Sequence, residues 1–306
     1  MLIVSNYHYI RPEYNAKYPS IFGVTPAEFR QQLLLLVNKG TFVNSLDLLN
    51  NSKQILESKE KFYLITFDDG LKEQFDYALP ILDELEIPAI FFVNSSNFFQ
   101  KKVSTVHKIH LLRSIISPNE FVQYLFNFDS IELSDLELKR AKNIYQYDDE
   151  KSAILKYVLN FKMTFKEQEE VIKQLFSHYF EEEYVLENLY MNEQSLKELA
   201  KRGCLGSHSH NHYPLGLLDL ESIKVEIENS KKILEKSTNS KIELIAYPFG
   251  TKEACTDSVG EIAKKAGFKF GFTTTRGTNT SFENPLLLNR FDCNDMPGGK
   301  NYKEEI

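Results

Sequence analysis

The chain has 306 residues, of which 42% are hydrophobic and 26% are charged, a composition typical of a soluble globular protein with a large buried core. Its 23 Phe and 16 Tyr side chains offer that core a large apolar surface, which argues against a disordered chain. The net charge is −7, from 36 Lys and Arg residues against 43 Asp and Glu residues. A general nucleic-acid binder carries a basic surplus, so we expect no nucleic-acid partner.

Residues 1–6 lack the basic and long apolar segments of a secretory signal peptide, and we expect a first β-strand there instead. The sequence contains no run of about 18 apolar residues, so we expect no membrane span and a cytoplasmic location. The cysteines are odd in number and far apart, which gives no disulfide or zinc pattern, so we expect each to be a small buried hydrophobe or a bystander: Cys204, Cys255 and Cys293.

The first third of the chain alternates strand and helix signals. We predict buried strands over 2–10, 62–67 and 88–93, and helices over 26–39 and 78–85. The first helix is marked by a capping box that pairs Thr25 with Glu28, and by a proline at its first position. Strand, helix and strand in this order are typical of a parallel sheet.

Residues 98–190 interrupt this alternation with a charged stretch that has few strand signals. Apolar residues recur there at helical spacing, for example over 111–116 and 171–176. We interpret the stretch as a helical insertion that covers the site and selects the substrate, or that forms an oligomer contact. We expect its histidines to be solvated residues on these helices: His107, His110 and His178.

The alternation resumes after the insertion. Helices are predicted over 193–201, 221–236 and 259–266, and strands over 204–207, 243–247, 268–274 and 286–291. Together with the first strands, these segments make seven or eight βα units, a number that forms a (β/α) barrel at this chain length. We therefore predict an α/β fold, with a single barrel domain over 1–306 and a helical insertion at about 98–190.

Three short motifs fall where predicted strands end, which is where parallel α/β folds place their active groups. The first is Thr66-Phe67-Asp68-Asp69-Gly70, in which two carboxylates directly follow a buried strand and a glycine permits a tight turn. An Asp-Gly pair is most often only a turn. Two charges beside a buried strand, however, need partners.

The second motif is His208-Ser209-His210-Asn211-His212, which holds three of the seven histidines. In a helical turn, His208 and His212 would lie on one face where a single metal ion can bridge them, and His210 would point elsewhere. Such a pair alone is often incidental. Two imidazoles together with a carboxylate form a common catalytic zinc set that leaves a position open for water.

The third motif is Ala246-Tyr247-Pro248-Phe249-Gly250, again at the end of a predicted strand. Taken alone, it indicates a turn in which proline and glycine end the strand. The order of the three motifs along the chain is more informative than any one of them.

In this order the motifs resemble those of the polysaccharide deacetylase family, also called the NodB-homology family or carbohydrate esterase family 4. The resemblance covers most of the chain outside the insertion, and Tyr7-His8 is similar to the start of some bacterial exopolysaccharide deacetylases in the family. It implies a distorted (β/α) barrel that removes N-acetyl groups, and less often O-acetyl groups, from sugars. It also implies one divalent metal ion, usually zinc.

The resemblance implies a role for each matching residue. Asp69 would be the carboxylate ligand of the metal, and His208 and His212 the imidazole ligands. Asp68 would be the general base, and the backbone N–H of Phe249 would help to stabilise the oxyanion. Adjacent strand residues point to opposite sides, which agrees with different roles for the two aspartates.

The chain departs from the family pattern in two places. Many relatives begin the third motif with an arginine that orients the base, whereas this chain has Ala246. We expect Arg290 to supply that charge, with a surface ion pair as the alternative. Many relatives also use a late histidine as general acid, but the last histidine here is His212 and the chain has no Trp. His8 is our candidate for that role, with a hydrogen-bonded core or loop histidine as the alternative.

We therefore expect a metal-dependent deacetylase, with zinc as the metal, that acts on an amino sugar in surface-polysaccharide metabolism. Its partner would be an acetylated amino sugar, an oligosaccharide, or a lipid-linked or nucleotide-linked sugar. Two alternatives stay open: a non-catalytic family member that binds sugar or metal, and a deformylase or O-deacetylase with the same metal site. The oligomeric state is also open.

Overall fold

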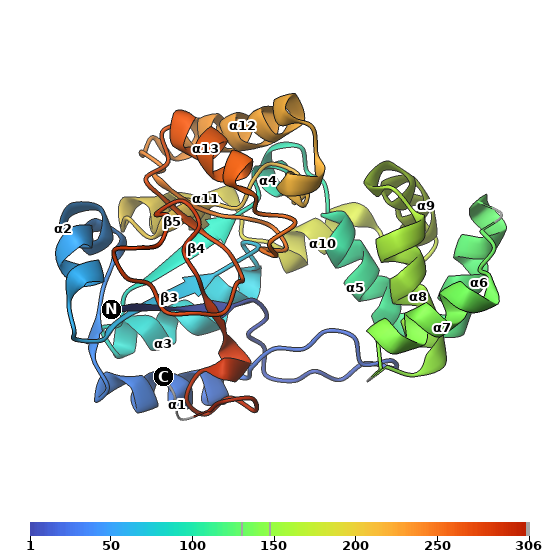
Figure 1. Ribbon diagram of the computed structural model, residues 1–306, viewed down its shortest axis with the longest axis horizontal. Coiled ribbons are helices and arrows are strands. Elements are labelled where there is room, and N and C mark those ends of the chain that lie inside the picture. The colour runs from blue at the N-terminus through green and yellow to red at the C-terminus, as the bar shows by residue number, and fades with distance from the viewer. Residues whose placement is uncertain (130, 147, 304–306) are drawn as a thin grey trace. The chain divides into compact units, whose positions relative to one another are not determined.

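The computed structural model describes residues 1–129, 131–146 and 148–303, and the chain forms two compact units (Figure 1). The first, here called the barrel unit, comprises Met1–Glu13, Gly23–Lys102 and Leu186–Ile306. The second, here called the helical unit, comprises Tyr14–Phe22 and Val103–Val185. No helix in the described part of the chain is long and apolar enough to cross a membrane.

The barrel unit is built on a curled parallel sheet. Its strands are β1 (Leu2–Tyr7), β2 (Thr41–Phe42), β3 (Phe62–Phe67), β4 (Ala89–Val93), β5 (Leu205–Ser207), β6 (Leu244–Ala246), β7 (Phe270–Phe272) and β8 (Phe291–Asp292). They lie in the order β7-β6-β5-β4-β3-β1-β8, with β2 beside β3, and all of these pairs are parallel. The prediction of a distorted (β/α) barrel with seven or eight parallel strands is confirmed.

The segment before β8 links the two edges of this sheet. Leu288 forms a parallel bridge with Phe272 of β7, and β8 pairs with β1. The strand predicted over 286–291 is therefore shorter than expected, because its earlier residues bond to β7 and to the segment after β7. Leu288 donates to the carbonyl of Gly271 over 2.7 Å and accepts from the N–H of Thr273 over 2.8 Å, and the N–H of Arg290 donates to the carbonyl of Thr275 over 3.0 Å.

Alternate residues along the strands enter two different hydrophobic clusters, as the period of a β-strand requires. In β3, Tyr63, Ile65 and Phe67 pack in one cluster and Leu64 packs in the other. The first cluster also contains apolar residues of the helices α1 (Pro26–Val37), α3 (Leu79–Glu84), α11 (Glu193–Lys201), α12 (Leu220–Thr238) and α13 (Asp257–Lys265). The second contains residues of α2 (Ser45–Glu57). Both faces of the strands are thus buried, which explains their continuous apolar runs.

Local signals set the helix ends. The predicted capping box at Thr25 is present, since its side chain accepts from the N–H of Glu28 and the Glu28 side chain accepts from the N–H of Thr25. The helix predicted over 78–85 is preceded by a π-helical turn, Gln74–Ala78. Pro80 has no N–H to donate, and such a residue interrupts the α-helical bonding pattern.

The helical unit contains α5 (Thr105–Ile115), α6 (Pro118–Asp129), α7 (Asp135–Ile144), α8 (Glu150–Tyr157) and α9 (Phe165–Ser177), and α10 (Glu182–Leu189) begins in it. The predicted helical character of this stretch is confirmed. The expected exposure of its histidines is only partly right. His178 is exposed and His110 is half-buried, but His107 is fully buried.

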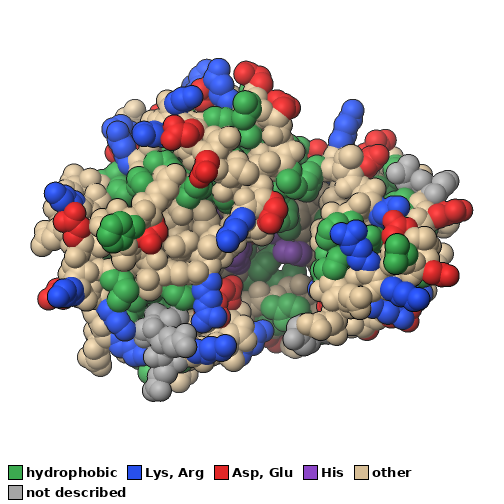
Figure 2. Space-filling model, in the orientation of Figure 1, with side chains coloured by type: hydrophobic (Ala, Val, Ile, Leu, Met, Phe, Trp, Pro, Cys, Tyr) green, Lys and Arg blue, Asp and Glu red, His purple; other side chains and the backbone are tan. Residues whose placement is uncertain are grey.

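Charged side chains cover much of the surface. Figure 2 shows acidic and basic groups interspersed over the face in view, as expected from 36 basic and 43 acidic residues in one chain.

The organisation of residues 1–306 as a single domain stays a prediction.

Candidate active site

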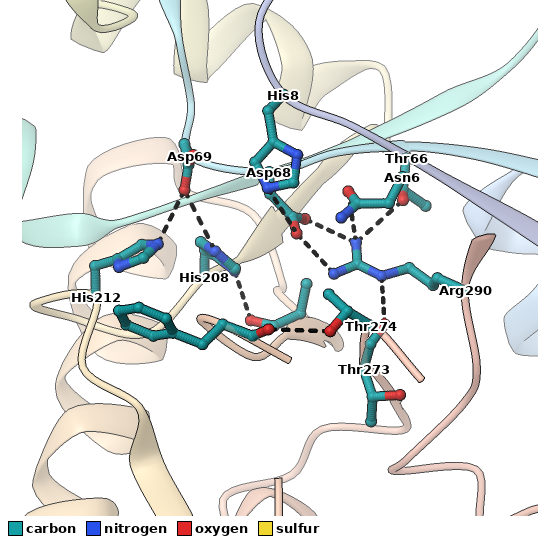
Figure 3. Close-up of polar contacts among 12 residues, drawn as sticks. Asn6, His8, Thr66, Asp68, Asp69, His208, His212, Thr273, Thr274 and Arg290 are labelled. Carbon is teal, nitrogen blue, oxygen red and sulfur yellow. Dashed lines mark hydrogen bonds and ion pairs between the residues drawn. The ribbon is translucent and has the colours of Figure 1, made fainter. Parts of the chain in front are cut away.

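The candidate site lies at the carboxyl ends of neighbouring parallel strands (Figure 3). Asp68 and Asp69 follow β3, and the loop 208–212 follows β5. Asp69 and Gly70 both have positive φ angles, of 78° and 65°, so the chain turns sharply at the end of β3. A Cβ atom on Gly70 would lie 2.8 Å from a side-chain atom of Val93, which explains why glycine occupies this turn.

Asp69, His208 and His212 converge on one point. The Oδ1 atom of Asp69 lies 3.4 Å from Nε2 of His208 and 3.1 Å from Nε2 of His212. The ligand atoms of all three residues lie within 4.8 Å of one another. Tetrahedral zinc, with bonds of about 2.0–2.2 Å, requires donor atoms roughly 3.3 Å apart. One carboxylate and two imidazoles at this spacing fit a divalent cation, and zinc suits this donor set.

The His208 ring is oriented for this role by its other nitrogen. Nδ1 lies 2.8 Å from the carbonyl oxygen of Ala246, and a carbonyl only accepts hydrogen bonds, so Nδ1 carries the hydrogen and Nε2 faces Asp69. Burial would lower the pKa of His208, but the carboxylates of Asp68 and Asp69 raise that pKa by more. The negative field that favours an imidazolium here would equally stabilise a bound cation.

The loop 208–212 is not the helical turn that the spacing predicts. Ser209 and His212 both have φ angles of 62°, a left-handed conformation that is uncommon outside glycine. The loop curls so that the rings of His208 and His212 lie 5.1 Å apart, and the N–H of His212 donates to Oγ of Ser209 over 3.2 Å. His210 points elsewhere, as predicted, with Nδ1 2.6 Å from Oγ of Ser95.

Asp68 pairs with Arg290, which is only 1% exposed. The two guanidinium nitrogens Nη1 and Nη2 donate to Oδ1 and Oδ2 of Asp68 over 2.8 and 2.6 Å. Arg290 also donates to the side chains of Asn6 and Thr66 and to the carbonyl of Thr273. The surface ion pair considered as an alternative is therefore wrong, because this arginine is buried in a two-bond pair with the predicted base.

Two opposing effects act on the Asp68 carboxyl. Burial would raise its pKa, but the charges of Arg290 and His208 lower that pKa by more. The net pKa lies below the usual value of an aspartate. Asp68 is therefore ionised at neutral pH and able to accept a proton.

His8 reaches the same site from the loop after β1. Its side chain is 39% exposed, and Nε2 lies 4.0 Å from Oδ2 of Asp68. Gln74 links the backbone at His8 to the backbone at Asp68, because its Nε2 donates to the carbonyl oxygens of both residues over 2.9 and 2.6 Å. His8 is thus a partly exposed loop residue and not a core histidine.

Phe249 lies next to His212, and the centroids of the two rings are 5.3 Å apart. Its φ angle is 62°, and that of Gly250 is 64°. The Phe249 carbonyl accepts from Oγ1 of Thr274 over 3.0 Å. A Cβ atom on Gly250 would lie 2.4 Å from Cγ2 of Thr274, so glycine is required for this turn to hold the Phe249 backbone beside the cluster.

Similarity to known proteins shows the family of this chain. The sequence model named polysaccharide deacetylase matches residues 56–114 and 163–271, which together make up more than half of the chain. The chain belongs to the polysaccharide deacetylase family. The matched segments of this family member include both aspartates of the first motif and the whole 208–212 loop.

Two solved structures share the fold of this family member at low sequence identity. IcaB from Ammonifex degensii has a TM-score of 0.59 and 19% identity, covering 97% of this chain and 94% of its own. The Streptococcus pyogenes deacetylase PplD, solved in complex with acetate, has a TM-score of 0.58 and 19% identity, covering 97% of this chain and 92% of its own.

A curated relative matches a shorter region. YxkH of Bacillus subtilis (strain 168), named provisionally as a polysaccharide deacetylase, is 26% identical over 102 residues. These residues make up 33% of this chain and 36% of YxkH. The match thus spans only about a third of that relative's length.

Sequence reasoning missed the residues that hold the 208–212 loop of this family member. Nδ2 of Asn94 donates to the carbonyl of His208, and Oγ of Ser230 donates to the carbonyl of Ser209 over 2.8 Å. The carboxylate of Glu226 accepts from the backbone of the loop. The available signal was a glutamate and a serine on the buried face of α12, where amphipathic spacing predicts apolar residues.

Proposed function

We propose that this chain is a metal-dependent hydrolase that removes the N-acetyl group from an amino sugar within a saccharide. The observation that carries the proposal is the convergence of Asp69, His208 and His212 beside an Asp68 carboxylate that Arg290 holds. Such a cluster suits amide hydrolysis, because that reaction needs an activated water, a base and a group that stabilises negative charge on the carbonyl oxygen.

Asp69, His208 and His212 would hold the cation, which would polarise the acetamide carbonyl and bring the pKa of a bound water toward about 7. Asp68 would accept a proton from the attacking water. Its ionised state at neutral pH and its two bonds to Arg290 support this role. Arg290 would act as a positioning residue, since its fork fixes the plane of the carboxylate.

His8 would deliver the proton that the leaving amine requires. Its partly exposed ring lies 4.0 Å from Asp68, close enough for a proton taken up by the base to be passed on with little movement. The chain has no histidine after His212, so the late histidine of many relatives has no counterpart here.

The backbone N–H of Phe249 would donate to the oxygen that becomes negatively charged during attack. The position of Phe249 beside His212 and its constrained left-handed backbone support this role. One such donor contributes about 3 kcal/mol to the lowering of the barrier. The substrate would be an acetylated amino sugar, as an oligosaccharide or as a lipid-linked or nucleotide-linked sugar in surface-polysaccharide metabolism.

The direct test is acetate release from a panel of N-acetylated amino sugars and oligosaccharides. We expect turnover with zinc, loss of turnover with a chelator, and recovery when zinc is restored. D69N should lose zinc binding and activity, whereas D68N should keep zinc and lose activity. Turnover that a chelator leaves unchanged would overturn the metal mechanism.

The same panel separates the alternatives. Preferred turnover of N-formyl or O-acetyl sugars would make the chain a deformylase or O-deacetylase with the same site. Zinc binding without hydrolysis of any acylated sugar would make it a non-catalytic binder.

A further inference from the structure

The loop that carries both proposed imidazole ligands has an energetically unfavourable backbone conformation. Ser209 and His212 both have φ angles of 62°, and non-glycine residues in this region persist only where the surroundings over-determine them. The loop is also buried, since Ser209 is fully buried and His210 is 5% exposed. Its backbone N–H and C=O groups therefore need partners within the protein.

Three carbonyl groups of the loop bond to residues 94–96, where β4 leads into α4 (Ser95–Phe99), and that of Ser209 also accepts from Ser230 of α12. His208 accepts from Asn94, Ser209 accepts from Ser95 over 3.3 Å, and His210 accepts from Ser96 over 3.1 Å. One side of the loop is thus fixed through neutral hydrogen bonds.

Two amide groups of the loop, those of His210 and Asn211, bond to Glu226 of α12. Glu226 is 5% exposed. Its Oε2 accepts from the N–H of His210 over 3.2 Å and from the N–H of Asn211 over 2.8 Å. Its Oε1 accepts from Nδ2 of Asn211 over 2.6 Å. The carboxylate therefore binds the two residues that lie between Ser209 and His212, in the way that successive backbone N–H groups bind an anion.

We infer that Glu226 is a positioning residue for the metal site, and this inference rests on the proposed function. Its carboxylate fixes the segment between the two imidazole ligands, so that both rings face Asp69 without rearrangement when a cation binds. Burial of a carboxylate is unfavourable unless its oxygens accept hydrogen bonds, and the oxygens of Glu226 accept them from the loop amides. Supporting residues of this kind typically contribute about 10- to 100-fold to metal affinity.

The position of Glu226 in α12 makes the substitution testable. Ile223 and Ile227, three positions before and one after, are buried in the core, so α12 itself stays anchored in a Glu226 variant. E226A leaves the N–H groups of His210 and Asn211 without their carboxylate acceptor. E226Q keeps the size of the side chain and one acceptor oxygen but removes the charge. Glu228 is exposed on the same helix, so E228Q is the matched control.

The experiment measures zinc affinity by competition with a chromophoric chelator, together with the visible spectrum of the cobalt-substituted protein. We expect the zinc Kd to rise about 10- to 100-fold in E226A and by a smaller factor in E226Q. We expect E228Q to match the wild type. The cobalt spectrum should change in both Glu226 variants, because the ligand geometry changes.

The possible outcomes are distinct. Wild-type zinc affinity and cobalt spectra in E226Q and E226A would overturn the inference while leaving the proposed function intact, even if both variants melt at lower temperature. If E226A does not fold, E226Q decides alone. A wild-type protein that binds neither zinc nor cobalt would overturn the metal site itself, and the role of Glu226 with it.

Discussion

Replacement of Arg290 tests the ion pair that holds the predicted base. Asp68 is 2% exposed and Arg290 is 1% exposed, and two hydrogen bonds of 2.8 and 2.6 Å join them. In R290M the methionine fills much of the arginine's volume, but the buried carboxylate loses its cationic partner. Removal of one partner from a buried pair costs about 3–5 kcal/mol, because the remaining charge cannot return to water.

We therefore expect R290M to lower the free energy of unfolding by about 3–5 kcal/mol, measured by urea denaturation of the metal-free protein with far-UV circular dichroism. R30M is the matched control. Arg30 forms the same two-bond pair with Glu84, at 2.8 and 2.5 Å, but on the surface, where such pairs contribute little. A loss in R290M no larger than the loss in R30M would refute the reasoning.

Two further variants separate charge from packing in the same pair. D68N/R290M should recover part of the lost stability, because neither side leaves an unpaired charge in the core. R290K keeps the charge but not the fork that matches a carboxylate, so we expect kcat between those of wild type and R290M. If R290M turned over at the wild-type rate, Arg290 would not position the base.

The other predictions concern the leaving-group proton, one glycine and the thiols. H8Q should lower kcat about 100-fold or more while the zinc Kd stays near the wild-type value; an unchanged kcat would exclude His8 as the general acid. G250A should lower stability by about 1–3 kcal/mol in a urea titration, because the new methyl group would lie 2.4 Å from Thr274; stability equal to wild type would contradict the strained turn. Burial raises the pKa of both Cys255 and Cys293 to about 12. Both should therefore resist iodoacetamide at about pH 8 until the protein is denatured, and adducts on them in the native protein, detected by mass spectrometry, would argue against their burial.

The central strands were predictable because their apolar runs are bounded by strong signals. The strand predicted over 62–67 matches β3, since an apolar run of this length ends abruptly at two aspartates. The last strand was harder to predict. The segment 286–291 contacts β7 through an isolated bridge at Leu288 before it joins β1, and no local sequence pattern indicates where a chain changes its partner strand.

The candidate metal-ligand set could be selected from residue types, but its geometry could not be predicted from the sequence. Spacing alone indicated that the rings of His208 and His212 could meet, and it indicated a helix as the means. The structure brings the rings together through left-handed residues at Ser209 and His212. That backbone depends on contacts from Glu226 and from residues 94–96, which are distant in sequence and leave no trace in the spacing of the histidines.

Arg290 gives Asp68 a cationic partner that the third motif, which begins with Ala246, does not supply. The carbonyl of Ala246 orients one imidazole, while the guanidinium comes from the opposite edge of the sheet. β8 pairs with β1 and β1 pairs with β3, so a residue just before β8 reaches the carboxyl end of β3. The guanidinium bonds there to groups on or after three strands besides its own: Thr273, Asn6, Thr66 and Asp68.

A carboxylate base at this position is oriented by a planar guanidinium that donates two hydrogen bonds to it. An arginine at position 246, at the end of β6, or one at position 290, just before β8, can provide that group. Delivery from β8 has a structural consequence, because the same bonds fasten the last strand to β1, β3 and the end of β7. In this protein the group that pairs with the proposed base also helps to close the barrel. Loss of catalytic orientation and loss of closure should therefore appear together in every Arg290 variant, whereas D68N should impair catalysis and leave the bonds to Asn6, Thr66 and Thr273 in place.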